Sequence, residues 1–304
     1  VAEALTNVTK HSGATDASVT LNGSGVTADR TATDSYVNGN ATLNFFGAAA
    51  DVTDLVAGNG SYRLTNLAVN NGGSYCTSQA VLGNWSLVVV YRQAGAAPRR
   101  IQVRDGLVAV RQATETVALS GFTGAATPSV RLSYIVHEGD PDQVGDGTYA
   151  ERVRWNGTTL SANNNAFNST VNGVANVYGL DIDTYTPTLA AGATTATMEI
   201  SSGTDLVLLQ TAITSIAVAP RYGVTVTPDG LAQPVQRLPG TGYSMPFTVS
   251  NTGNVDDTYN LLLSGTGNPL FAVLDSLRGP GLVNTVRPDS ARIPVLSGQS
   301  AVVY

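Results

Sequence analysis

The sequence predicts an all-β fold, with an N-terminal jelly-roll-like β-sandwich followed by a smaller immunoglobulin-like β-sandwich. Two observations support this prediction. Apolar residues recur with a period of two or form short β-branched runs, and Gly, Pro and Asn separate the runs. The helical period of 3.6 is almost absent.

The first two thirds of the chain contain enough predicted strands for two packed sheets. They are expected at 40–46, 61–69, 85–92, 99–105, 114–120, 129–137, 151–155, 194–201, 205–209 and 212–219. The run "SLVVVY" (86–91) is apolar on both faces, which predicts a central strand covered on each side. Residues 51–62 are expected to hold a capped turn or a single helical turn.

A change of composition near Pro220 marks the predicted domain boundary. Residues 1–39 are interpreted as a lead segment, 40–219 as the larger sandwich and 220–304 as the immunoglobulin-like sandwich. Alternation within 222–230 and 243–254 predicts the early strands of this last domain, and Tyr259, Leu261 and Leu263 are expected to face inward.

Composition limits the classes of partner. The 304 residues carry a net charge of −6, only 12% are charged, and Lys10 is the one lysine. No basic run is interleaved with aromatic residues, so nucleic acid is not an expected partner. No stretch approaches the roughly 18–20 apolar residues of a membrane-spanning helix, so no membrane span is expected. The surface is expected to be solvated mainly by hydroxyl and amide groups.

Several separated motifs resemble a known family. They are "DVTDLVAGNGSYRLTNLAVNNGGSYCTSQAVLGNWSLVVVYR" (51–92), "YIVHEGDPD" (134–142), "FNSTV" (167–171), "YGLDIDTYTP" (178–187) and "SSGTDLVLLQTAITSIAV" (201–218). Together they resemble a family of β-sandwich domains of unknown function in large secreted bacterial and archaeal surface proteins. The stretch 222–304 is similar to the adhesion-related and glycosidase-associated immunoglobulin-like repeats that commonly follow it. The resemblance implies an extracellular or cell-surface location and a non-catalytic role.

Catalytic motifs are scarce, and the chain is not expected to be an enzyme. A Ser–His–acid arrangement needs a histidine, and the chain has only His11 and His137. No GxSxG, HExxH or Gly-rich phosphate loop occurs. A carboxylate pair for glycoside hydrolysis stays an open alternative, because any two of the 22 acidic residues can converge in the fold.

The segment "HEGDPDQVGDGTYAE" (137–151) predicts a Ca2+ site. Its five carboxylates match the oxygen ligands that Ca2+ prefers; they are Glu138, Asp140, Asp142, Asp146 and Glu151. An EF-hand is rejected because Val144 takes a ligand position and the flanks predict strands. A Ca2+-stiffened loop between strands is the hypothesis, and a solvated acidic hairpin balanced by Arg152 and Arg154 is the alternative. Asp181 and Asp183 form a weaker second candidate.

Glycosylation is also expected. The sequon N-x-S/T occurs at Asn7, Asn22, Asn40, Asn59, Asn84, Asn156 and Asn168. The abundant threonine equally permits O-linked sugars.

The function predicted from these features is a non-catalytic structural subunit of an extracellular filament or cell-surface assembly, joined head-to-tail by strand complementation. The stretch "LSGQSAVVY" (296–304) begins a strand, whereas immunoglobulin-like repeats normally continue through two further strands. Our hypothesis is that the lead segment of one subunit completes the C-terminal domain of its neighbour, giving a homopolymer. The candidate assembly residues are Val1, Leu5, Val8, Val19, Leu21, Val302 and Tyr304.

Three alternatives stay open at this point. The natural chain can continue past Tyr304, or residues 1–39 can pair only within their own sandwich. A carbohydrate-binding or adhesion module is the competing function, with surface glycans as partners. Such a module needs an exposed aromatic platform, and Trp85 and Trp155 are the only tryptophans.

Overall fold

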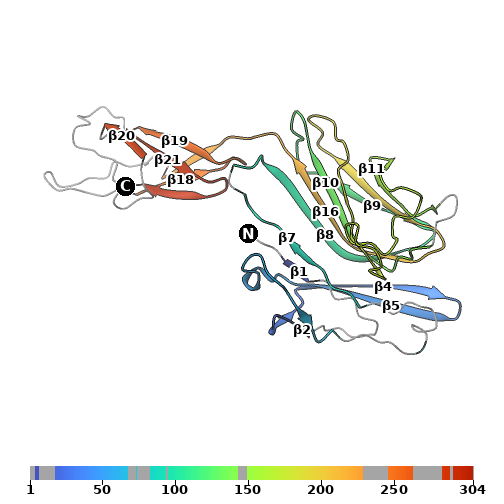
Figure 1. Cartoon of the computed structure of the whole chain (residues 1–304). Coiled ribbons are helices and arrows are strands. Elements are labelled where there is room, and N and C mark those ends of the chain that lie inside the picture. Colours follow the sequence, from blue (N-terminus) through green and yellow to red (C-terminus); the bar gives the residue numbers. More distant parts are fainter. Residues whose placement is uncertain are drawn as a thin grey trace. The chain divides into compact units, whose positions relative to one another are not determined.

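The all-β prediction is confirmed by the structure, a computed structural model of the chain. It describes residues 4–6, 18–67, 73, 83–93, 95–142, 149–228, 246–262, 283–287 and 290–303. The chain divides into two compact units (Figure 1). The N-terminal unit comprises Val1–Ala94 and Arg99–Val218, and the C-terminal unit comprises Gly95–Pro98 and Ala219–Tyr304.

Two antiparallel sheets form the centre of the N-terminal unit (Figure 1). The first has the order β13-β10-β16-β8, with β14 also paired to β10. Its strands are β8 (Arg99–Val110), β10 (Val130–His137), β13 (Leu180–Asp181), β14 (Thr184–Tyr185) and β16 (Val207–Ala217). The second has the order β12-β11-β15-β9 and contains β9 (Ala113–Leu119), β11 (Arg152–Trp155), β12 (Thr158–Thr159) and β15 (Ala196–Ser202).

The main hydrophobic core lies between these two sheets. Alternate residues of each strand point into it, as the period of two requires. Leu132, Tyr134 and Val136 of β10 pack there with Met198 and Ile200 of β15. All five side chains are fully buried. The two sheets therefore form a β-sandwich.

A ribbon of two strands covers the other face of the first sheet. It consists of β4 (Arg30–Asn38) and β5 (Ala41–Ala49). Phe45 of β5 packs with Leu107 and Leu208 of the first sheet. The neighbouring Phe46 faces the opposite way, into a cluster with Leu21. Both faces of β5 are therefore buried from Phe45 to its end.

Short strands complete the N-terminal unit. They are β1 (Ala4–Thr6), β2 (Ser18–Leu21), β3 (Ser24–Thr27), β6 (Leu64–Thr65) and β7 (Leu87–Val89). β2 lies between β3 and β6, and β1 pairs with β7. The 3-10 helix η1 (Thr53–Leu55) confirms the helical turn expected within 51–62.

Three details of the predicted strands need correction. The run 86–91 is not a central strand, because only Leu87–Val89 is a strand and Tyr91 is 71% exposed. The predicted strands 205–209 and 212–219 form one strand, β16, interrupted by a bulge at Gln210. Residues 18–38 of the predicted lead segment contain β2, β3 and β4 of the N-terminal unit.

The C-terminal unit contains two three-stranded sheets in its described residues. The first sheet is β17 (Val224–Thr227), β18 (Phe247–Asn251) and β22 (Ser300–Val303), and the second is β19 (Asp257–Leu262), β21 (Ser290–Val295) and β20 (Val283–Arg287). Val249 and Val303 pack against Ile293 and Val295 between the sheets. Tyr259 and Leu261 also pack on this core as predicted, and Leu263 lies outside the described residues.

No helix in the described parts of the chain has the length and apolar character needed to cross a membrane.

Candidate functional site

Four acidic side chains gather at one end of the N-terminal sandwich. Glu138 follows the last residue of β10, Glu151 precedes β11, Asp181 ends β13 and Asp205 precedes β16. Glu151 and Asp181 are fully buried, Asp205 is 6% exposed and Glu138 is half-buried. We call these four residues the acidic cluster.

Hydrogen bonds that involve backbone groups connect the loops around the acidic cluster. The Glu138 N–H donates to the Gly179 carbonyl at 3.2 Å, and the Ser169 hydroxyl donates to the Gly139 carbonyl at 2.6 Å. The Thr170 N–H donates to Asp181 Oδ1 at 3.1 Å. Three segments distant in sequence are thereby joined at this end of the sandwich.

The acidic cluster has many oxygens without a hydrogen-bond partner. They are Glu138 Oε2, both Glu151 Oε1 and Oε2, Asp181 Oδ2 and Asp205 Oδ2. Burying an ionised carboxylate without a partner is very unfavourable, so such groups are usually neutralised by a proton, a cationic side chain or a metal ion.

The electrostatics of the acidic cluster favour protonation. Burial, together with the nearby charge of Asp205, raises the pKa of Glu138 to about 9 and the pKa of Glu151 to about 9. Burial also raises the pKa of Asp181 to about 7, although the Thr170 N–H opposes this shift. The pKa of Asp205 is raised, again mainly by burial. The carboxyl groups of Glu138 and Asp205 also influence each other's pKa.

Basic side chains do not neutralise the acidic cluster in the described structure. The alternative prediction placed Arg152 and Arg154 beside the acidic segment. Instead, Arg152 Nε donates to Asn164 Oδ1 at 2.8 Å, and Arg154 pairs with Glu199 at 3.5 Å. The cause is the alternation of β11, which sends Val153 and Trp155 into the core and the two arginines away from it.

The structure separates the residues of the predicted Ca2+ loop. Glu138 and Glu151 belong to the acidic cluster, whereas Asp140 and Asp142 are exposed. Asp146 lies outside the described residues. Asp181 comes from the weaker candidate, but its neighbour Asp183 faces the Tyr134 hydroxyl at 3.0 Å.

Sequence reasoning missed Asp205 as a ligand candidate. Its only signal was an acidic residue at the start of a predicted strand, which is a common pattern. Within the described residues, no three His, Cys, Asp or Glu side chains already have the arrangement of an assembled metal site.

His137 is fully buried beside the acidic cluster. Its Nε2 forms a short hydrogen bond with the Gln210 amide oxygen, so it contacts neither a carboxylate nor a hydroxyl through this atom. Burial lowers the pKa of His137 to about 4, which leaves the ring neutral at pH 7. His11 lies outside the described residues.

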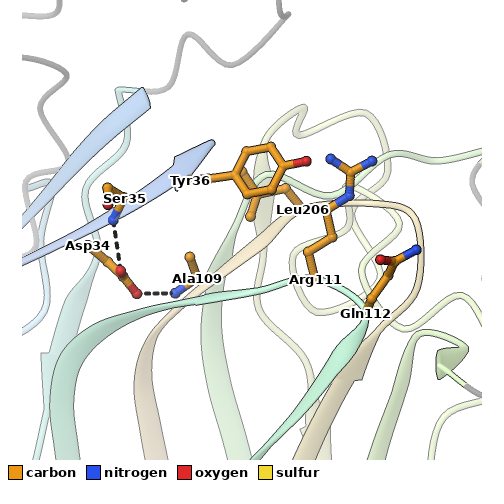
Figure 2. Close-up of a pocket in the computed structure, with 7 residues that line it drawn as sticks. All are labelled: Asp34, Ser35, Tyr36, Ala109, Arg111, Gln112 and Leu206. Carbon is orange, nitrogen blue, oxygen red and sulfur yellow. Dashed lines mark hydrogen bonds between the residues drawn. The ribbon is translucent and has the colours of Figure 1, made fainter. Parts of the chain in front are cut away.

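A polar pocket of about 310 Å³ lies beside the middle of β4 and the end of β8 (Figure 2). The groups that could bind a ligand there are already engaged. Asp34 accepts from the Ser35 and Ala109 N–H groups, both at 2.7 Å. The Arg111 guanidinium lies 4.9 Å from the Tyr36 ring centroid and covers one face of the ring. Because of these contacts, few polar groups of the pocket are left to form hydrogen bonds with a sugar.

Neither tryptophan forms an exposed platform. Trp155 is buried in the main core, where its Nε1 donates to the Thr188 carbonyl at 3.0 Å. Trp85 packs, partly buried, against the cluster around Phe46. The exposed aromatic side chains of the described residues are tyrosines; they are Tyr91, Tyr149, Tyr178 and Tyr222.

The predicted sequons differ in accessibility. The exposed asparagines are Asn22, Asn40, Asn59 and Asn156. Asn84 and Asn168 are half-buried, and the Asn84 amide donates to the Gly179 carbonyl at 2.7 Å. Asn7 lies outside the described residues.

The structure distributes the predicted assembly residues over both units. Val19 and Leu21 are buried against Phe46 in their own subunit, so β2 cannot serve as a donor strand in this arrangement. Leu5 is paired with Val88. Val302 is 38% exposed on β22. Val1, Val8 and Tyr304 lie outside the described residues.

Comparisons with family models, curated proteins and solved structures gave no match to this chain.

Proposed function

We propose that this chain is a non-catalytic structural subunit of an extracellular or cell-surface assembly, in which copies join by strand complementation at the C-terminal unit. The observation that carries the proposal is the exposure of apolar side chains on both outer strands of the β17-β18-β22 sheet. Val224 and Val226 of β17 are 47% and 41% exposed, and Val302 of β22 is exposed as well.

The edge strands of a sheet can pair with a strand from another molecule. Their outer N–H and C=O groups can pair with another strand, and soluble proteins usually protect them with charge, proline or a bulge. β22 pairs with β18 alone among the described residues, and its sequence "SAVV" carries no charge. An added strand would gain main-chain hydrogen bonds and cover Val302.

The first seventeen residues of a neighbouring copy are the donor that we propose. The described part of this segment, Ala4–Thr6, pairs with Leu87–Val89 in a two-stranded sheet. Such a short contact stabilises the N-terminal unit little and can be exchanged between subunits. A head-to-tail contact of this kind joins two different surfaces, so repeated contacts can build an open filament.

The surface agrees with an extracellular setting. A charged fraction of 12% and exposed sequons such as Asn40 and Asn156 favour a surface solvated by hydroxyls, amides and attached sugars. We therefore include glycosylation and a cell-surface location in the proposal.

Electron microscopy and light scattering of V302K test the edge contact. A lysine on the outer strand should shift the population from polymer toward monomer, because a charge opposes pairing at an edge. V37K is the matched control, since Val37 is an exposed valine on β4 of the other unit and should leave assembly unchanged. Equal polymer yield from V302K and V37K would contradict the edge contact.

Deletion of residues 1–17 tests the donor separately, because it leaves β2 intact. We expect the shortened chain to fold and stay monomeric. A shortened chain that polymerises like the full chain would exclude this donor.

A carbohydrate-binding module is the second candidate, and only the pocket beside Tyr36 favours it. The engaged state of Asp34 and Arg111 makes this candidate weaker. Glycan binding by the wild-type monomer that is lost in Y36A would support it.

A further inference from the structure

We propose that the acidic cluster is a binding site for one hard divalent cation of the Ca2+ class, with Glu138, Glu151, Asp181 and Asp205 as its side-chain ligands. These residues come from four separate segments of the N-terminal unit. The site is therefore not the continuous loop that the sequence suggested. It also goes beyond the proposed assembly, because its ligands and its test are independent of polymer formation.

The unpartnered oxygens are the first support for the proposal. Ca2+ takes six to eight oxygen ligands, mainly from carboxylates, carbonyls and water. The acidic cluster offers five oxygens without a hydrogen-bond partner on its four residues. Two of these oxygens belong to Glu151, which is fully buried, so water cannot satisfy them from bulk solvent.

The mutual contacts of the four residues are the second support. Asp205 lies close enough to both Glu138 and Glu151 for their charges to interact. The charges of Glu151 and Asp181 also interact. Asp181 Oδ2 lies beside Gly139, the residue after Glu138, at a position that a Cβ atom would occupy. The four carboxyl groups thus form one continuous group.

The third support is that no basic side chain of the described residues is paired with the acidic cluster. The ion pairs described for this chain join Arg30 to Asp105 and Arg154 to Glu199, and neither reaches the acidic cluster. A bound cation would neutralise the group without any rearrangement of the arginines, and it would give the buried oxygens their missing partners.

Protons and a cation compete for the same oxygens. A cation at 2.3–2.6 Å from each oxygen would take the place of the protons.

Exposed Asp140 lies beside the acidic cluster. It follows Glu138 by two residues, and its charge acts on both Glu138 and Asp205. Half-buried Glu138 and exposed Asp140 are therefore the solvent-exposed side of this region, whereas Glu151 and Asp181 are fully buried.

Thermal unfolding with and without metal tests the proposal. The full chain is treated with EDTA, dialysed and melted at pH 7.5, alone or with 5 mM CaCl2, and tryptophan fluorescence follows the transition. Both tryptophans belong to the N-terminal unit, so the signal reports on the unit that holds the site. A cation present at about 100 times its Kd should raise the melting temperature by about 5–10 °C. Isothermal titration of CaCl2 should give one site per chain.

Two isosteric variants identify the ligands. E151Q and D205N should lose most of the Ca2+-induced shift. Without metal they should melt at the same temperature as the wild type or higher, because burial already disfavours the charged form of both carboxyl groups and a neutral amide of the same size carries no such cost. That second result separates the loss of a ligand from simple misfolding.

D142N is the matched control, because Asp142 belongs to the acidic segment but is exposed outside the acidic cluster. It should keep the full shift. The proposal is overturned if CaCl2 leaves the wild-type melting temperature unchanged. It is also overturned if D142N loses the shift while E151Q and D205N retain it, since the ligands would then lie in the continuous loop.

Discussion

Replacement of Gly139 by alanine should destabilise the N-terminal unit by steric conflict alone. A Cβ atom built on Gly139 would overlap Asp181 Oδ2, and it would lie 2.5 Å from the Phe167 carbonyl oxygen and 2.9 Å from its carbonyl carbon. The first neighbour is a side chain that can move. The Phe167 carbonyl is backbone, so the loop itself must shift.

The magnitude follows from the cost of overpacking. Inserting one methyl group into a closely packed site typically costs about 1–3 kcal/mol. The backbone neighbour places G139A in the upper part of this range, at about 2–3 kcal/mol. For a unit of about 200 residues this corresponds to a fall in melting temperature of about 4–12 °C. Chelator is present in every sample so that a bound cation does not obscure the difference.

Urea unfolding followed by tryptophan fluorescence measures the effect, because both tryptophans lie in the N-terminal unit. The control is G106A on β8, where the added Cβ meets no atom within 4 Å. G106A should change the free energy of unfolding by less than about 0.5 kcal/mol. If G139A is as stable as G106A, the packing of this loop against Phe167 is not as described.

Two further substitutions test one unit each. Asn251 is buried in the C-terminal unit, where its amide donates to the Val255 and Val295 carbonyls and its Oδ1 accepts from the Gly253 N–H. N251A should therefore cost about 2–4 kcal/mol, measured as faster hydrogen exchange within 246–303 and unchanged exchange within 99–217. Met198 is fully buried in the main core, so M198A should cost about 2–5 kcal/mol by urea unfolding. Exchange that rises equally in both units of N251A, or an M198A cost below 1 kcal/mol, would contradict these accounts.

The strands of the central sandwich were largely predictable from the sequence. β9, β10, β11 and β15 begin and end within about two residues of the predicted ranges. Each has alternating apolar residues that supply one side of the main core, and this is the pattern that a period-two analysis detects. The break predicted near Gln210 was also real, but it is a bulge within β16 and does not end the strand.

Strands outside the central sandwich were harder to predict. β4 has the sequence "RTATDSYVN" and contains no fully buried residue, so its apolar signal is weak. It is a strand because all nine of its residues pair with β5. The prediction for residues 86–91 was wrong for the opposite reason. Its apolar residues satisfied the pattern of a central strand, yet its described strand pairs only with the three residues of β1. In both segments, pairing with strands distant in sequence determines whether a strand forms. This pairing cannot be read from local composition.

The acidic cluster shows why only some residues of a site can be predicted from a sequence. Glu138 and Glu151 were found because only twelve residues lie between them and the intervening segment is rich in acids. Asp181 and Asp205 are far from them in sequence; Asp181 was noticed only as part of the separate, weaker candidate with Asp183, and Asp205 was missed. They meet because β13 and β16 both pair with β10, which brings the end of β13 and the start of β16 to the end of β10. Antiparallel pairing thus collects ligands from strand ends. A search of one continuous segment can find only those that the same loop happens to contain.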